Sequence, residues 1–145
     1  MIRTLLPAVL AFSIAGCGFT RGAPPAVPIP PVLTGAVSTQ GHIALAPDTQ
    51  LRVRLEELAG GDAPPQFIAE TTIPRIGQPP VRFRIAIDPR VIDPKRSYTL
   101  TARIEREDQL LFISDPPVRV LTGGNPSQVE IVVKPAGGRK QPLSP

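Results

Sequence analysis

Cysteine and histidine, the side chains that most often carry nucleophilic or metal chemistry, each occur once in this chain of 145 residues, as Cys17 and His42. A metal site built from these residue types needs three or four ligands, so the sequence excludes one. The acidic residues do not cluster, which argues against an all-carboxylate site. His42 could join Ser38 or Ser97 and an acid in a nucleophilic triad, but no local motif supports that arrangement. We expect His42 to be a surface or turn residue.

Glycine pairs and Asp-Pro steps are the other patterns that could mark a site. The glycine pairs at positions 60–61 and 123–124 lack the helix and lysine of a phosphate-binding loop, so they favour turns with positive φ. Asp88 and Asp93 each precede a proline, where an aspartate commonly caps its own turn. An enzyme acting on cell-wall polysaccharide would need paired acids in a cleft. The sequence therefore predicts a protein without catalytic residues, metal or cofactor.

The N-terminus has the order of a secretion signal. Arg3 gives a short basic start, and an apolar run of eleven residues extends from Leu5 to Ala15. An α-helix needs about 20 apolar residues to cross a bilayer, so this run is too short for a permanent span. We predict that residues 1–16 are a signal peptide.

Cys17 follows that run directly, and Ile14-Ala15-Gly16-Cys17 resembles the lipobox of bacterial lipoproteins. The resemblance implies cleavage between Gly16 and Cys17 by the lipoprotein signal peptidase. It also implies attachment of a diacylglycerol, and of fatty acids such as palmitate, to Cys17. With an ordinary signal peptide, Cys17 would instead be a free thiol without a partner. Gly18 is not the aspartate that retains enteric lipoproteins at the inner membrane, so we expect an outer-membrane lipoprotein facing the periplasm.

Charge gives little support to a nucleic-acid partner. The chain has 16 basic and 12 acidic residues, and removal of Arg3 with the signal leaves 15 basic residues. The basic residues neither form a run with interleaved aromatics nor accompany a nucleic-acid motif. We expect alternating charges on solvated strand faces and no nucleic-acid binding.

Residues 17–32 are rich in proline and almost uncharged. We predict that they form the lipidated N-terminus and a linker, and whether this linker is a stiff polyproline II segment or a disordered spacer stays open. After Pro135 the apolar periodicity ends, and we predict a disordered tail over residues 136–145.

Between these ends, apolar residues recur with period two, as in strands with one buried face. The clearest runs are Leu51–Leu55, Val81–Ile87, Tyr98–Ile104 and Val129–Val133; less regular ones are Thr34–Leu45, which is broken near Gly41, Gln66–Ile73, Leu110–Ile113 and Val118–Leu121. Turn-forming Gly, Asp, Asn and Pro residues separate them. The pattern predicts an all-β fold over residues 33–135: a single antiparallel β-sandwich, or a small barrel, of seven to eight short strands. Phe83 and Leu100 should face the core, with Arg82 and Thr101 outside.

An ordered series of short matches accompanies these strands. It consists of Leu33-Thr34-Gly35, Ile43–Asp48, Leu51–Glu57, Ile68-Ala69-Glu70, Gln78–Phe83, Ile92–Tyr98, Ala102-Arg103-Ile104 and Leu110-Leu111-Phe112. In this order the chain resembles the YbaY and YscW-like lipoprotein family, which includes pilotins, the chaperones of type III secretion secretins. The resemblance covers about residues 33–134.

The resemblance implies a non-catalytic β-sandwich lipoprotein that holds a segment of an envelope protein, and in pilotins that protein is a secretin subunit. Binding could occur by strand addition at an exposed edge or in a groove that accepts a helix. Asp115–Leu121 is a candidate edge, although Pro116 and Pro117 would equally serve to block unwanted pairing. The alternative is a general structural or stress-related envelope lipoprotein with no dedicated peptide ligand.

Overall fold

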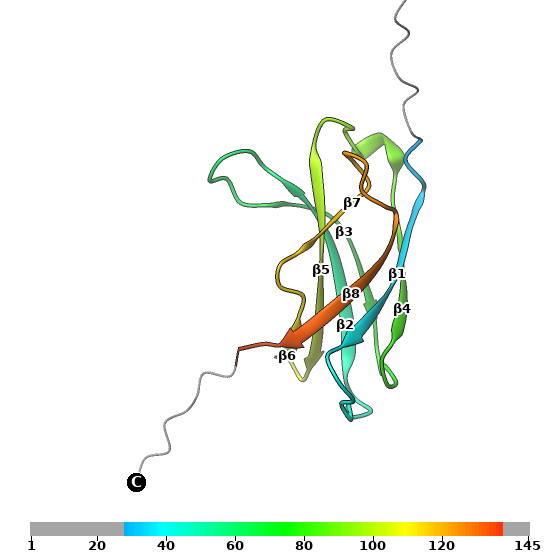
Figure 1. Cartoon of the computed structure of the whole chain (residues 1–145), viewed down its shortest axis with the longest axis vertical. Coiled ribbons are helices and arrows are strands. Elements are labelled where there is room, and N and C mark those ends of the chain that lie inside the picture. The colour runs from blue at the N-terminus through cyan, green and yellow to red at the C-terminus, as the bar shows by residue number, and fades with distance from the viewer. Residues whose placement is uncertain (1–27, 138–145) are drawn as a thin grey trace, which may run out of the picture.

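The computed structural model describes residues 28–137, which form strands, turns and one short 3-10 helix, with no α-helix in that range (Figure 1). The elements are β1 (Val32–Thr39), β2 (Gln50–Leu58), β3 (Gln66–Ile73), β4 (Val81–Ala86), η1 (Pro89–Val91), β5 (Ser97–Arg106), β6 (Gln109–Ile113), β7 (Val118–Val120) and β8 (Gln128–Pro135). The prediction of an all-β fold with seven to eight strands is confirmed. The predicted signal peptide, most of the predicted linker and most of the predicted tail lie outside the described residues.

The strands form one hydrogen-bonded path in the order β3-β2-β5-β6-β8-β1-β4, and β7 pairs with β5 beside this path. Two parts of the sheet, one around β2 and β5 and one formed by β8, β1 and β4, meet where β6 pairs with β8. The end strands β3 and β4 lie near each other on the opposite side (Figure 1). The result is a nearly closed, barrel-like sheet around one core.

The expected antiparallel arrangement is wrong for one strand pair. β1 and β8 run parallel, from Thr34 beside Gln128 to Thr39 beside Val133. Apolar alternation reveals which face of a strand is buried but carries no information about its direction. No hairpin fixes the direction of β8 against β1, because the chain reaches β8 from β7 on the other part of the sheet.

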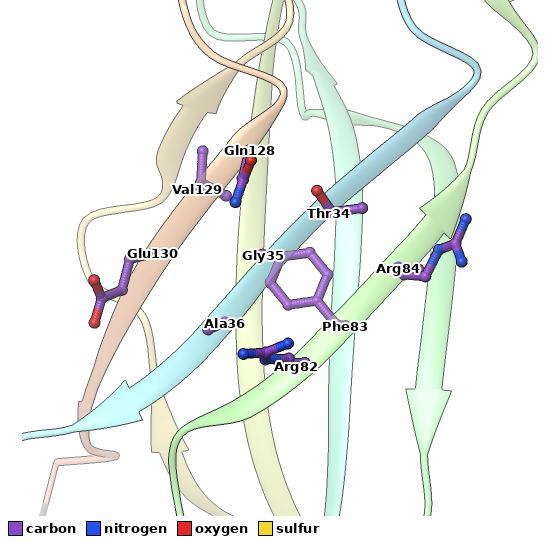
Figure 2. Close-up of a pocket in the computed structure, with 9 residues that line it drawn as sticks. All are labelled: Thr34, Gly35, Ala36, Arg82, Phe83, Arg84, Gln128, Val129 and Glu130. Carbon is purple, nitrogen blue, oxygen red and sulfur yellow. The ribbon is translucent and has the colours of Figure 1, made fainter.

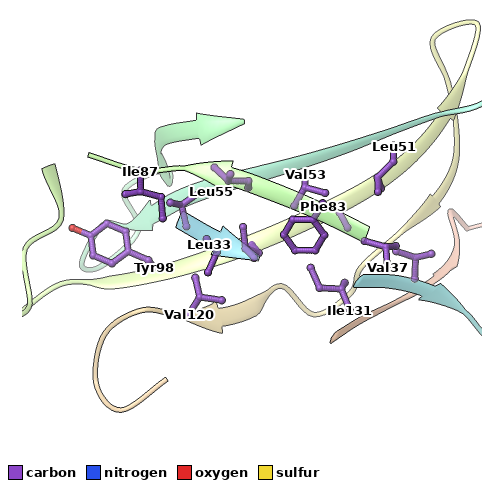
Figure 3. Packing of buried hydrophobic residues seen from close by; sticks show 14 of the residues in the cluster. Leu33, Val37, Leu51, Val53, Leu55, Phe83, Ile87, Tyr98, Val120 and Ile131 are labelled. Atoms are coloured by element: carbon purple, nitrogen blue, oxygen red, sulfur yellow. The ribbon is translucent and has the colours of Figure 1, made fainter. Parts of the chain in front are cut away.

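The core is built from alternate residues of the strands on both parts of the sheet, and Figure 3 shows side chains from both parts meeting there. Its most buried members include Leu33, Val37, Leu51, Val53, Leu55, Phe83, Ile85, Tyr98, Leu100, Ile104, Val120, Ile131 and Val133. Phe83 and Leu100 are buried as predicted, while Arg82 is exposed and Thr101 is half-buried. Period-two alternation therefore located the inward positions correctly, but Thr99 and Glu105 of β5, which it placed on the solvated face, are buried as well.

One inward position of β1 carries no side chain. Gly35 lies between the buried Leu33 and Val37, directly across from Phe83 on β4. A Cβ atom at Gly35 would collide with the carbonyl oxygen of Val129 and lie 2.7 Å from the Phe83 ring. The absence of a side chain thus lets the Phe83 ring lie under β1.

The turns at the two Asp-Pro steps follow the sequence prediction. The Asp88 carboxylate accepts a hydrogen bond from the Arg90 backbone N–H at 3.0 Å and caps η1. The Asp93 carboxylate accepts one from the Lys95 backbone N–H at 2.9 Å. Both aspartates therefore cap their own turns, as expected.

Candidate functional site

The predicted edge segment Asp115–Leu121 contributes β7, one side of which is paired. Val118, Arg119 and Val120 lie opposite Leu100, Thr99 and Tyr98 of β5. Between β6 and β7, the Ser114 backbone N–H donates to the Ala102 carbonyl at 2.9 Å. The Ser114 hydroxyl accepts from the Ala102 N–H at the same distance. β6 and β7 therefore line the same edge of β5, separated by the proline step.

The far edge of β7 has no strand partner among the described residues. β8, on that side, pairs with β6 only through Lys134 and Pro135. Its residues from Gln128 to Val133 pair with β1 on one edge, and no described strand pairs with the other edge. Figure 1 shows β8 running obliquely from beside β1 to β6. We call the facing edges Val118–Val120 and Gln128–Val133 the β7–β8 seam.

The seam has an apolar floor and two closed ends. Val120 and Ile131 are completely buried beneath it, and Val118 and Val129 are half-buried against the same core. At one end the Leu121 N–H donates to the Pro126 carbonyl at 3.2 Å, and at the other the Ala136 N–H donates to the Leu111 carbonyl at 2.9 Å. A strand edge without a partner presents a row of N–H and C=O groups that can pair with another chain.

The second surface is the outer face of β4, β1 and β8, which we call the hollow face. It consists of Arg82 and Arg84 on β4, Thr34, Ala36 and Ser38 on β1, and Gln128, Glu130 and Val132 on β8. A hollow of about 720 Å³ lies over Gly35 and Ala36. Figure 2 shows the two arginines on one side of β1 and Glu130 on the other. The small residues of β1 leave this depression between the charged flanks.

Arg82 and Arg84 have no carboxylate side chain within 4.0 Å. Every aspartate and glutamate of the sequence lies between Asp48 and Glu130, within the described residues. The two guanidinium groups are therefore not neutralised by an acidic side chain of their own chain.

The outer face of β2, β3 and β5 is the opposite case, and we call it the ion-paired face. Its arginines and glutamates are Arg52, Arg54, Glu56, Glu70, Arg103 and Glu105. Arg54 donates to Glu70 at 2.9 Å, and Arg103 lies 3.2 Å from Glu105. The bond from Glu70 raises the pKa of the Arg54 guanidinium. Alternating charges on a solvated face, predicted from the sequence, here neutralise one another.

The linker end of the domain is held by a buried phenol. The Tyr98 hydroxyl accepts from the Asp93 N–H at 2.9 Å and donates to Glu57 at 3.2 Å, and Glu57 pairs with Arg96 at 3.1 Å. Burial raises the pKa of the Tyr98 phenol, and the nearby Glu57 carboxylate adds to that rise. The Pro31 carbonyl accepts from the Ile87 N–H at 2.9 Å, which ties the described end of the linker to the residue after β4.

His42 is exposed in the segment between β1 and β2, as expected. It lines a hollow of about 390 Å³ with Ser38 and Glu130, so the structure brings one of the two candidate serines and an acid near it. No hydrogen bond among the described residues joins these three side chains, and Ser97 lies on β5. A triad requires the nucleophile, base and acid to be within hydrogen-bonding reach of one another. The geometry therefore gives no support to a nucleophilic site.

The predicted cleavage and lipidation residues, Gly16 and Cys17, lie outside the described residues. Within residues 28–137 no group of three or more His, Cys, Asp or Glu side chains is placed to hold a metal ion. No helix in the same range is long and apolar enough to cross a membrane.

Comparison with known sequences adds the decisive observation. The sequence model described as type III secretion system lipoprotein chaperone (YscW) matches residues 30–133. The chain belongs to the YscW family. The resemblance recognised in the ordered sequence matches is thereby confirmed.

Two relatives of this YscW-family chain illustrate its neighbours. The uncharacterized lipoprotein YbaY of Escherichia coli (strain K12) is 32% identical over 104 residues, which are 70% of this chain and 55% of that protein. The chain thus spans about half the length of that relative. An alternative pilotin from the type II secretion system of Vibrio cholerae has a similar structure. Its TM-score is 0.69 at 30% identity, over 74% of this chain and 97% of that chain.

Sequence reasoning missed both the free edge of β8 and the hollow face. Gly35 was the available signal for the second, because a glycine inside a strand pattern often marks a close approach of another backbone or ring. In this YscW-family chain, the alternation within a strand predicts which face a charged side chain lies on. Whether that side chain forms an ion pair depends on which strands lie beside it, and the alternation does not predict this.

Proposed function

We propose that this YscW-family chain is a non-catalytic, membrane-anchored envelope lipoprotein that holds an extended segment of another envelope protein at the β7–β8 seam. The observation that carries the proposal is the pair of facing strand edges without a strand partner above a buried apolar floor. Membership of a family described as lipoprotein chaperones supports the chaperone role.

Strand addition accounts for the features of the seam. A guest segment supplies backbone N–H and C=O groups to the free edges and rests alternate apolar side chains on Val118 and Val129. Prolines 116 and 117, which precede β7, have no N–H to donate and limit pairing to the seam itself. The guest is therefore an extended segment with apolar residues at alternate positions and no central proline.

The anchor supplies the second half of the function. Cleavage of the bond between Gly16 and Cys17 removes residues 1–16 and leaves Cys17 as the lipid-bearing N-terminus. Residues 17–32 connect Cys17 to the β domain over residues 33–135. The domain then faces the periplasm, with the outer membrane as its destination. A secretin subunit is one candidate guest, since a similar structure is that of a type II secretion pilotin.

A charge placed at the seam tests the binding role. Val118→Lys puts an ammonium group at the free edge, and charged residues at edges prevent strand addition. Val81→Lys is the matched control, because Val81 is also a half-buried valine against the same core but lies on β4. Both full-length proteins, tagged and extracted in detergent, are compared for captured envelope proteins and for thermal unfolding.

We expect Val118→Lys to lose the captured protein by roughly tenfold or more while Val81→Lys retains it at equal stability. Capture that is equal in both variants, or absent from the parent protein, contradicts the seam as a binding site. An envelope lipoprotein with no dedicated ligand would then remain.

The anchor has a separate test. Cys17→Ser removes the thiol that accepts the lipid, so it should abolish incorporation of a tagged fatty acid and block processing of the precursor. Label that persists in the Cys17→Ser protein would rule out Cys17 as the anchor.

A further inference from the structure

We propose that the hollow face binds a second copy of this chain, with the two copies related by a two-fold axis parallel to β1. The proposal is independent of the seam, which lies at the free edge of β8 rather than on its outer face. It rests on the proposed lipid anchor only for the local concentration of the copies.

The first observation is the register of the three strands. Ala36 lies opposite Arg82 on β4 and opposite Glu130 on β8, so these three residues form one row across the hollow face. Thr34 lies between Arg84 and Gln128 in the same way. Strands are spaced about 4.8 Å apart, which separates the flanking residues of each row by about 10 Å.

The charges of the first row are opposite but not paired within the chain. Arg82 has no carboxylate within 4.0 Å, and Ala36 between the two flanks is too short to fill the hollow. One flank is therefore positive, the other negative, and the middle is open (Figure 2).

A two-fold axis along β1 makes this row complementary to itself. The rotation keeps the height of each row and exchanges its flanks, so Arg82 of each copy faces Glu130 of the other, twice. Arg84 faces Gln128 in the next row, where the guanidinium can donate to the amide oxygen. Ala36 meets Ala36 on the axis and lets the strands approach. Such an isologous contact closes as a dimer.

The same axis also fits the requirement that both lipid anchors enter the same membrane. It leaves β1 of both copies pointing in one direction, so both linkers leave the dimer at the same end and can enter one membrane. A face three short strands wide is small beside a standard interface of about 800 Å² per partner, and association free in solution is weak. Confinement of both copies to one membrane raises their effective concentration and compensates for this weak association.

Cysteine cross-linking of the full-length protein in intact cells tests the contact. With the Cys17 sulfur carrying the diacylglycerol group, Ala36→Cys supplies the one reactive thiol, and a short bismaleimide should give a strong dimer band. Thr72→Cys is the matched control, since Thr72 is exposed on β3 at the ion-paired face. The parent protein should give no band, and a band there would report a free Cys17, which is a failure of the anchor and not of the dimer.

Charge reversals on the Ala36→Cys background decide between this dimer and random collision. Arg82→Glu alone and Glu130→Arg alone should each lower the dimer yield roughly tenfold, because each turns two attractive pairs into repulsive ones. The double reversal should restore the yield, and the two single variants expressed together should cross-link with each other. Lys95→Glu, an equal charge change in the exposed turn before β5, should leave the yield unchanged.

Two results would overturn the proposal. One is a dimer yield for Ala36→Cys no higher than that for Thr72→Cys. The other is a double reversal that stays as low as the single variants while circular dichroism of the purified proteins shows that all are folded.

Discussion

The ion-paired face and the hollow face are built on the same kind of strand, with buried apolar residues alternating with polar ones, yet they use their charges differently. On the ion-paired face, Arg54 and Glu70 are direct neighbours across β2 and β3 and form a hydrogen bond at 2.9 Å. On the hollow face, Arg82 and Glu130 lie on either side of Ala36 without contact. Ala36, which lies between Arg82 and Glu130, thus keeps apart two charges that would neutralise each other if they were direct neighbours, as they do on the ion-paired face.

The difference supports the proposal that partners bind on the side with the unpaired charges. A face whose charges are already paired gains little from a new contact, because each pair would have to be broken first. A face with opposite charges held apart can pair with a partner at no such cost. β8 supplies both Glu130 on the hollow face and the free edge of the seam, so both proposed contacts are centred on this strand.

The largest expected effect is a difference in stability between replacing the phenylalanine beneath the hollow face and replacing the one on the ion-paired face. Phe83 is 2% exposed beneath the hollow face, whereas Phe67 is 57% exposed on β3. Phe83→Ala should lower the free energy of unfolding by about 3–5 kcal/mol, because it leaves a cavity in the core. Phe67→Ala should change it by about 0.5 kcal/mol or less. Urea unfolding measures both, and similar losses would mean that the two faces are packed alike.

The next effect concerns the glycine beneath the hollow. Gly35→Ala places a methyl group against the Val129 carbonyl and the Phe83 ring, and overpacking of this kind should cost about 1–3 kcal/mol. Gly77→Ala is the control, since nothing lies within 4 Å of its added Cβ atom. If thermal unfolding shifts equally in both variants, β1 does not need its glycine for packing.

Alkaline pH should weaken the β2–β5 side through Tyr98. Its pKa is raised in the folded protein, so its contribution is complete below the unfolded value of about 10 and is lost as pH rises through the folded value. Tyr98→Phe should lose about 1 kcal/mol at neutral pH with its hydrogen bonds and show a weaker decline above about pH 10. Urea unfolding across this range would contradict the assignment if both proteins declined in parallel.

The smallest effect compares the charges directly. A double-mutant cycle on Arg54 and Glu70 should give a coupling of about 0.5 kcal/mol that decreases with salt. The same cycle on Arg82 and Glu130 in dilute monomer should give a coupling near zero, because the two side chains do not meet within one chain. A measurable coupling in the second cycle would show that the Arg82 and Glu130 side chains of one chain contact each other across the hollow, which would contradict the account.

Much of the fold could be predicted from local alternation. The run Gln66–Ile73 coincides with β3, and the inward positions of β4 and β5 were identified from alternation, although β5 also buries Thr99 and Glu105 on its other face. The run Thr34–Leu45 is interrupted near Gly41, as the sequence indicated, because β1 ends at Thr39 and Gly41 adopts φ 90°, a conformation that leaves the strand. The direction of β8 was not predictable, since alternation is identical in parallel and antiparallel strands.

The two surfaces could not be predicted for a related reason. Arg82 and Arg54 look alike in the sequence, each alternating with buried apolar residues. Only the register shows that Arg54 lies beside a glutamate and Arg82 beside an alanine. The free edge of β8 likewise exists because β6 reaches only its last two residues.

Amide hydrogen exchange on the full-length protein in detergent, with and without the captured envelope segment, tests the central claim that the β8 side is where partners bind. The account predicts new protection in Val118–Val120 and Gln128–Val133, and unchanged exchange in Gln66–Ile73 on β3. Protection that falls on β3 and the ion-paired face, with the seam exchanging as freely as before, would contradict it.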